Sequence, residues 1–213
     1  MGGDTWFGVP NYGEFVGVYY NQDAFAAAGL EIPTTDEEFV DVLDAFVAQG
    51  VTPLAEAGAE YPLGQLWYQL ALLEGDRGFV DSYQLYDGEV DWQGPEVTAA
   101  SETLKDYVDK GYIASDVSSV KAEDAGVSFI NGTSPIFVSG SWWFGRFVSE
   151  ATGFDWTMTA FPGADLSLGS SGNLWVVPEN AANKELAYEF IDITMRPETV
   201  SYTHLTLPTT PYV

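Results

Sequence analysis

Residues 134–147 read SPIFVSGSWWFGRF, and this stretch decides the fold. The β-branched and aromatic run 136–139 predicts a strand that ends at Gly140, where a helix begins. Glycine lets the backbone pass close to its neighbours, and Trp142 and Trp143 each offer a flat apolar face and one N–H donor. The stretch therefore predicts either a stacking platform for a sugar or two tryptophans packed in the core, and both interpretations stay open.

Extended and helical segments alternate on both sides of this stretch. Strands are predicted from β-branched and aromatic runs, and helices from apolar residues that recur every three or four positions. The expected strands are residues 7–20 (two strands around a crossing loop), 51–55, 136–139, 154–161 and 174–177. The expected helices are residues 21–28, 36–49, 61–74, 95–110, 122–130 and 184–195. This alternation predicts an α/β fold.

The clearest helix start lies at Thr35. Thr35 and Glu38 have the spacing of a capping box, in which each side chain bonds to the backbone of the other residue. Apolar residues then fall on one face until Gly50, a residue that commonly ends a helix. A helix over this segment is therefore strongly specified by local signals.

The composition excludes several classes of partner. Against 32 Asp+Glu there are 7 Lys+Arg, which gives this acidic chain a net charge of −25. That field repels phosphate backbones and anionic headgroups, so neither nucleic acid nor a membrane surface is expected as a partner. Cysteine is absent, the one histidine is His204, and no run of 18 apolar residues suggests a membrane span.

The last residues continue no pattern of the chain. From Val200 they read VSYTHLTLPT and then TPYV, which resembles the conceptual translation of a transposon-type sequencing adapter. Residues 199–213 are therefore expected to be a non-native tail and are set aside, as a fusion scar would be. Without His204, Ser-His-Asp and Cys-His catalysis and zinc sites built on His or Cys are excluded. We expect no catalytic residues, no metal site and no cofactor.

Several short motifs follow one another in order over residues 7–198. They are Gly8-Val9-Pro10; Val18-Tyr19-Tyr20-Asn21-Gln22-Asp23 with Phe25; Ala28-Gly29-Leu30; Pro33-Thr34-Thr35 before Glu38-Phe39; Phe129-Ile130-Asn131-Gly132; Phe137-Val138-Ser139-Gly140-Ser141-Trp142; Phe161-Pro162-Gly163; and Asn183-Lys184-Glu185-Leu186-Ala187 with Glu189-Phe190. In this order and spacing the chain resembles the extracellular solute-binding proteins of ABC sugar transporters, family 1, which are maltose-binding-protein-like.

The resemblance implies a periplasmic-binding-protein-like fold of type II, in which two α/β lobes close on a ligand. Residues 1–10 would be a crossing or hinge segment, and residues 11–161 the ligand-binding lobe of the carboxy-terminal type. Residues 162–198 would return to the other lobe. The chain would thus be a fragment, mostly one lobe plus a strand and helix of the other. Exposed strand edges would make such a fragment marginally stable.

The resemblance also implies ligand-binding residues. Trp142 takes the position where an aromatic ring stacks on a sugar face, and Glu14 has the offset of a carboxylate that accepts from two sugar hydroxyls. Asn173 precedes the strand of the opposite lobe and both donates and accepts. Core packing or a solvated surface is the alternative for each residue. The expected ligand-binding residues are Trp142, Trp143, Glu14, Asn11, Tyr12, Tyr61, Ser171, Gly172 and Asn173.

The function implied is that of the substrate-binding component of an ABC transporter. Such a protein captures a sugar or oligosaccharide in an interlobe cleft and delivers it to the transmembrane subunits of the permease. The full-length protein would be a monomer in the periplasm or outside the cell, either free or lipid-anchored, and the export signal is expected to be absent from this fragment. It would not be an enzyme. A glycoside hydrolase, which needs two carboxylates, or a carbohydrate-binding module is the alternative.

Overall fold

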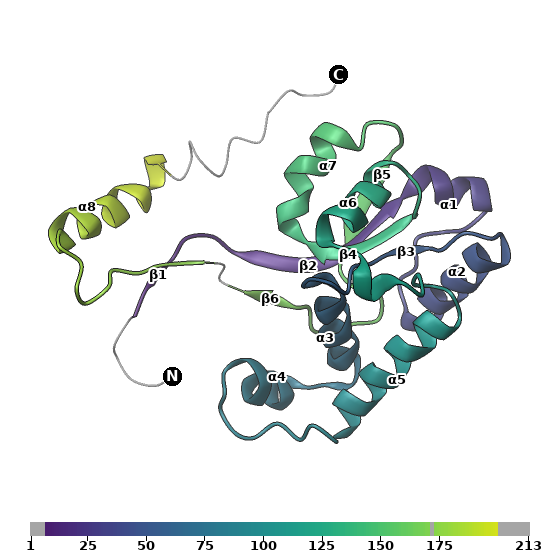
Figure 1. Ribbon diagram of the computed structural model, residues 1–213, viewed down its shortest axis with the longest axis horizontal. Helices are drawn as coiled ribbons and strands as arrows, with labels where there is room; N and C mark the ends of the chain where they lie inside the picture. The colour runs from purple at the N-terminus through teal and green to yellow at the C-terminus, as the bar shows by residue number, and fades with distance from the viewer. Residues whose placement is uncertain (1–6, 171–172, 200–213) are drawn as a thin grey trace. The chain divides into compact units, whose positions relative to one another are not determined.

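The computed structural model describes residues 7–170 and 173–199, which divide into two compact units (Figure 1). Residues 14–169 form the first unit. The described part of the second unit comprises residues 7–13, 170 and 173–199. The boundaries lie after Gly13 and Gly169, and the predicted α/β class is confirmed. The assignment of residues 1–10, 11–161 and 162–198 to a hinge and two lobes stays a prediction.

The first unit is built on a mixed sheet of order β3-β4-β2-β5. The long strand β2 (Glu14–Asn21) pairs antiparallel with β4 (Ile136–Gly140) on one side and with β5 (Trp156–Thr159) on the other. The short strand β3 (Leu54–Ala55) runs parallel to β4, and β6 (Gly169–Ser170) pairs with β2 off this path. Residues 136–140 therefore lie beside residues 16–20 of β2, which is the longest of the described strands.

The two faces of this sheet carry separate cores. Side chains alternate along a strand, so Val16, Val18 and Tyr20 enter the first core while Tyr19 enters the second. The first core also holds Phe39 and other side chains of the helices on its face. The second core is mostly aromatic and is formed by Tyr19, Ala55, Ala57, Ala125, Phe129, Phe137, Trp143, Phe147 and Ala151.

Helices cover both faces of the sheet in Figure 1. Their bounds are α1 (Gln22–Ala28), α2 (Asp36–Ala48), α3 (Pro62–Glu74), α4 (Arg77–Gln84), α5 (Pro95–Asp109), η1 (Val117–Ser119), α6 (Ala122–Ile130), η2 (Ser141–Trp143) and α7 (Phe144–Glu150). The described helices include none long and apolar enough to cross a membrane.

The local helix signals are confirmed. At the start of α2, Thr35 Oγ1 accepts from Glu38 N and Glu38 Oε2 accepts from Thr35 N, both at 3.2 Å. Gly29 closes α1 in the left-handed conformation, with φ of 70°. These signals act within a few residues, which is why the sequence suffices to place them.

Other elements differ from the prediction. The sequence did not predict α4, which has no buried residue but begins at Asp76, whose Oδ1 accepts from Phe79 N at 3.0 Å. The strands predicted over residues 51–55, 154–161 and 174–177 are shorter than expected, because only part of each segment reaches a pairing partner.

The second unit contains a two-stranded ribbon and one helix. Strand β1 (Val9–Pro10) pairs antiparallel with β7 (Leu174–Trp175), and α8 spans Lys184–Thr194. The Trp175 ring meets the Phe190 ring of α8 edge to face, with centroids 5.6 Å apart. No residue of α8 is buried. The described apolar side chains of this unit therefore lack the enclosure that both cores of the first unit provide.

Candidate functional site

An exposed aromatic pair lies where β4 ends. Trp142 is 40% exposed and Tyr61, which precedes α3, is 44% exposed. Their ring centroids are 5.8 Å apart in an edge-to-face arrangement, and Trp142 Nε1 donates to Tyr61 Oη at 3.1 Å. Large aromatic rings held in place yet open to solvent suit stacking on a ligand.

Gly140 allows this arrangement because the Trp142 ring lies directly over it. A Cβ at Gly140 would come within 1.8 Å of the indole, so any larger residue there would displace the Trp142 ring. Tyr19 Oη donates to Gly140 O at 2.9 Å, and Phe15 N donates to Ser141 Oγ at 3.3 Å. Burial raises the pKa of Tyr19, so its hydroxyl stays protonated as a donor. The strand-to-helix turn is therefore fixed from both sides.

Trp143 has a different environment from its neighbour. It is 6% exposed, and its ring packs in the second core, stacked on Phe147 at 5.5 Å and edge-on to Phe137 at 5.4 Å. The Arg146 guanidinium lies 5.2 Å from the indole centroid. The core-packing interpretation thus describes the Trp143 ring in the structure, and its contact with a ligand stays a prediction.

The Tyr61 hydroxyl joins the two tryptophans. It accepts from Trp142 Nε1 and also from Trp143 Nε1, the latter at 3.3 Å. A phenolic oxygen has two acceptor positions and one proton, so these two bonds leave the proton for donation to another group. The preceding residue is fixed as well, because Glu60 Oε2 accepts from Ala122 N at 2.8 Å. The pair thus combines an apolar face with an oriented O–H donor.

Glu14 lies beside this turn, at the start of β2. Val16 pairs with Gly140 in the sheet, and Glu14, two residues earlier, projects to the same face as Val16. Its side chain is partly buried. The structure thus brings Glu14 to the edge of the sheet where Trp142 lies.

Three other predicted residues meet in the second unit. Asn11 N donates to Asn173 O at 3.0 Å, and Asn173 Nδ2 donates to Tyr12 Oη at 2.6 Å. Asn11 Oδ1 accepts from Trp175 Nε1 at 3.1 Å. Ser171 and Gly172 lie outside the described residues. The predicted residues therefore form one group in each unit.

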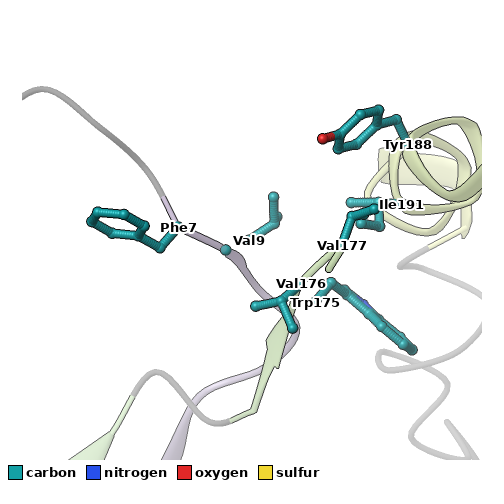
Figure 2. Close-up of a pocket in the computed structure, with 8 residues that line it drawn as sticks. Phe7, Val9, Trp175, Val176, Val177, Tyr188 and Ile191 are labelled. Atoms are coloured by element: carbon teal, nitrogen blue, oxygen red, sulfur yellow. The ribbon is translucent and has the colours of Figure 1, made fainter. Parts of the chain in front are cut away.

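The second unit also has an apolar pocket (Figure 2), lined by Phe7, Gly8, Val9, Trp175, Val176, Val177, Tyr188 and Ile191. None of these is a predicted ligand-binding residue. The only side-chain polar atoms in the lining are the Tyr188 hydroxyl and the Trp175 N–H, and the latter already donates to Asn11. The pocket therefore lacks the converging polar groups of a sugar site.

Sequence reasoning missed one buried acid. Glu56 is 5% exposed, and burial raises its pKa well above the ordinary 4.5. An acid inside the otherwise apolar run Leu54-Ala55-Glu56-Ala57 was the available signal. Within the described residues, no group of three or more His, Cys, Asp or Glu side chains is arranged to hold a metal ion.

Comparison with known proteins gives a consistent result. Residues 1–213 match the family model described as bacterial extracellular solute-binding protein. The multiple sugar-binding protein of Streptococcus mutans is 28% identical over 166 residues, which are 74% of this chain and 38% of that protein.

Solved structures agree with this match. A chitin oligosaccharide binding protein is 26% identical with a TM-score of 0.81, over 92% of this chain and 51% of that one. A solute-binding protein in complex with raffinose is 22% identical with a TM-score of 0.72, over 92% and 53% of the two chains. The chain thus spans about half the length of these structures, and the predicted periplasmic-binding-protein-like fold is confirmed. By its sequence and its fold, this chain belongs to the family of bacterial extracellular solute-binding proteins.

Proposed function

We propose that this chain is part of the substrate-binding component of an ABC transporter, which captures a sugar or oligosaccharide in the interlobe cleft of the complete protein. The observation that carries the proposal is the exposed Tyr61–Trp142 pair at the end of β4. The names of the relatives, which are a multiple sugar-binding protein and a chitin oligosaccharide binding protein, support a carbohydrate ligand.

The chemistry of the aromatic pair suits a sugar. Covering ~100 Å² of apolar sugar surface with the Trp142 ring would contribute about 2.5 kcal/mol before the costs of association. The Tyr61 proton would donate to a sugar oxygen, and the Glu14 carboxylate would accept from hydroxyls. In the proposal, Trp143 supports the site through its bond to Tyr61.

The second group of residues would also present polar atoms to a sugar. Asn11, Tyr12 and Asn173 are already joined by hydrogen bonds, so their orientation is set before a ligand arrives. Ser171 and Gly172, which lie outside the described residues, stay predicted ligand-binding residues. Backbone N–H groups and amides of this kind bond readily to hydroxyl oxygens.

The complete protein would act as a monomer in the periplasm or outside the cell, free or lipid-anchored, and would deliver its ligand to the transmembrane subunits of the permease. Preferential binding of the sugar to the closed form would drive closure of the two lobes. The family and the compared relatives are named as binding proteins, which supports a role without catalysis.

Tryptophan fluorescence tests the proposal. The complete protein encoded by the source gene is titrated with raffinose, stachyose and a chitin trisaccharide, and one of them should give a saturable change with a Kd near micromolar, about −8 kcal/mol. Trp142→Ala should abolish the change. The matched control is Trp92→Ala, because Trp92 is 63% exposed but packs on Tyr83 instead.

A response to none of the three sugars, or an unchanged response in Trp142→Ala, would argue against the proposal. Release of reducing sugar from the same three compounds would instead favour the glycoside hydrolase.

A further inference from the structure

Glu56 is a buried acid that the proposed sugar site does not yet use. Both carboxyl oxygens are enclosed, and neither has a hydrogen-bond partner among the residues that the structure describes. Gln69 is equally enclosed, but it donates to Leu166 O at 2.9 Å and accepts from Leu168 N at 3.0 Å. Glu56 thus carries a polar group that costs stability and that the described chain does not pair.

The sheet register places Glu56 on the face of the first core. Strands β3 and β4 run parallel with Leu54 beside Ile136 and Ala55 beside Phe137. Both Ala55 and Ala57 lie in the second core, so Glu56, between them, projects to the opposite face. That is the face that carries Ile136 and Val138.

The same face carries the Trp142 ring. Val16 belongs to the first core and pairs with Gly140, so the position above Gly140 that the indole fills is on this face. Continuing the parallel register puts Glu56 one strand and two residues away from Gly140, about 8 Å between the backbones. A glutamate side chain spans about half of that distance, so the carboxyl can extend toward the position that the Trp142 ring fills above Gly140.

A second unpaired acceptor lies on the neighbouring helix. Gln65 Oε1 is buried without a partner among the described residues, and Gln65 follows Tyr61 by four positions, one turn later on the same side of α3. A carboxyl and an amide oxygen that both lack donors call for a ligand with several O–H groups. Burial raises the pKa of Glu56, and the nearby Ala57 N–H, which falls short of hydrogen-bonding geometry, offsets this only in part.

We propose that Glu56 is a ligand-binding residue of the same site. Its carboxyl and Gln65 Oε1 accept hydrogen bonds from hydroxyls at one end of the bound sugar, after the Trp142 ring turns away from Gly140. This inference rests on the proposed sugar-binding function and adds two hydrogen-bond acceptors to the proposed site. Glu56 and Gln65 would therefore recognise the sugar by those of its hydroxyl groups that extend beyond the Trp142 ring.

The test compares Glu56→Leu with the wild type in the complete protein, by thermal unfolding and by fluorescence titration with the member of the three-sugar panel that binds. The variant should unfold about 2–4 °C higher, because an unpaired buried carboxyl is removed. Its sugar affinity should fall about tenfold to a hundredfold, as expected for the loss of about two buried hydrogen bonds to the sugar. Glu56→Gln should recover part of the affinity.

Tyr68→Phe is the matched control, because it removes a buried polar group that also lacks a described partner, from a ring that packs on Phe79 and Tyr83, and it should leave the affinity unchanged. Unchanged affinity in Glu56→Leu would overturn this inference alone, as would a lower unfolding temperature, which would reveal a structural partner for the carboxyl. A wild type that binds none of the three sugars would overturn the proposed function and this inference with it.

Discussion

The two units of the chain differ in how far they bury their apolar side chains. In the first unit, Leu43 of α2 is fully buried and belongs to a continuous core. In the second unit, Leu186 of α8 is 64% exposed although its helix has an apolar side as well. The same residue type in the same kind of element thus has opposite surroundings. The first unit buries its apolar side chains within its own core, whereas the described residues of the second unit do not.

A matched pair of side-chain truncations tests this comparison most directly. Leu43→Ala should lower the free energy of unfolding by about 2–5 kcal/mol, because it opens a cavity in the first core. Leu186→Ala should change it by less than about 0.5 kcal/mol, as exposed substitutions do. Urea unfolding followed by circular dichroism measures both. A large loss in Leu186→Ala would mean that α8 is covered in solution, and the comparison would fail.

The same contrast between a buried and an exposed apolar side chain occurs within the first unit, at Trp143 and Trp142. Gly126→Ala would bring a methyl group within 2.2 Å of the buried Trp143 ring, and the overpacked core should lose about 1–3 kcal/mol. Gly140→Ala crowds the exposed Trp142 ring even more closely, but that ring has solvent to move into, so the loss should stay below about 1 kcal/mol. Urea midpoints measure both variants.

Equal losses would show that Trp142 is held as rigidly as Trp143. In that case a movement of Trp142 away from Gly140, which the inference on Glu56 requires, would become costly.

The sequence predicted most helices because their signals are local. The Thr35–Glu38 box and Gly29 act within one turn of the chain, and both were found from spacing alone. Strand lengths were harder, because β5 ends where its pairing with β2 ends, and that partner lies far away in the sequence.

The candidate site was predictable only in part. The sequence selected Trp142, Trp143 and Tyr61, and the structure joins all three through one hydroxyl. It could not separate the two tryptophans, because the burial of Trp143 depends on Gly126 of α6, a residue with no local link to it. The position of Glu56 likewise depends on the pairing of β3 with β4.

A pH series sharpens the role of Glu56 in the first unit. Because burial raises the pKa of Glu56 above 4.5, the folded chain keeps a proton that the unfolded chain releases as the pH rises. The contribution of Glu56 to the free energy of unfolding therefore falls as the pH rises above 4.5, by up to about 1.4 kcal/mol per pH unit, until the folded group also ionises. The stability advantage of Glu56→Leu should grow over this range.

The control for the pH series is Gln69→Leu, which removes a buried group without a titratable proton. The difference in free energy of unfolding between Gln69→Leu and the wild type should therefore not change with pH on account of residue 69. The free energies of unfolding of Glu56→Leu and the wild type could instead differ by a constant amount from pH 4.5 to neutrality. That result would show that Glu56 is ionised in the folded chain, and its carboxyl would then have a partner.

Of the variants expected to lose about 1 kcal/mol or more, the one at the helix cap of α2 has the smallest effect. Thr35→Ala removes the oxygen that accepts from Glu38 N and should cost about 1 kcal/mol, whereas Thr35→Ser keeps that oxygen and should cost little. Because the capping box and the core below α2 lie within residues 14–169, this loss should be equal in the whole chain and in residues 14–169 expressed alone. Urea unfolding of both forms measures it. A loss that appears only in the whole chain would mean that the first unit depends on the second for its stability, contrary to the contrast between the two.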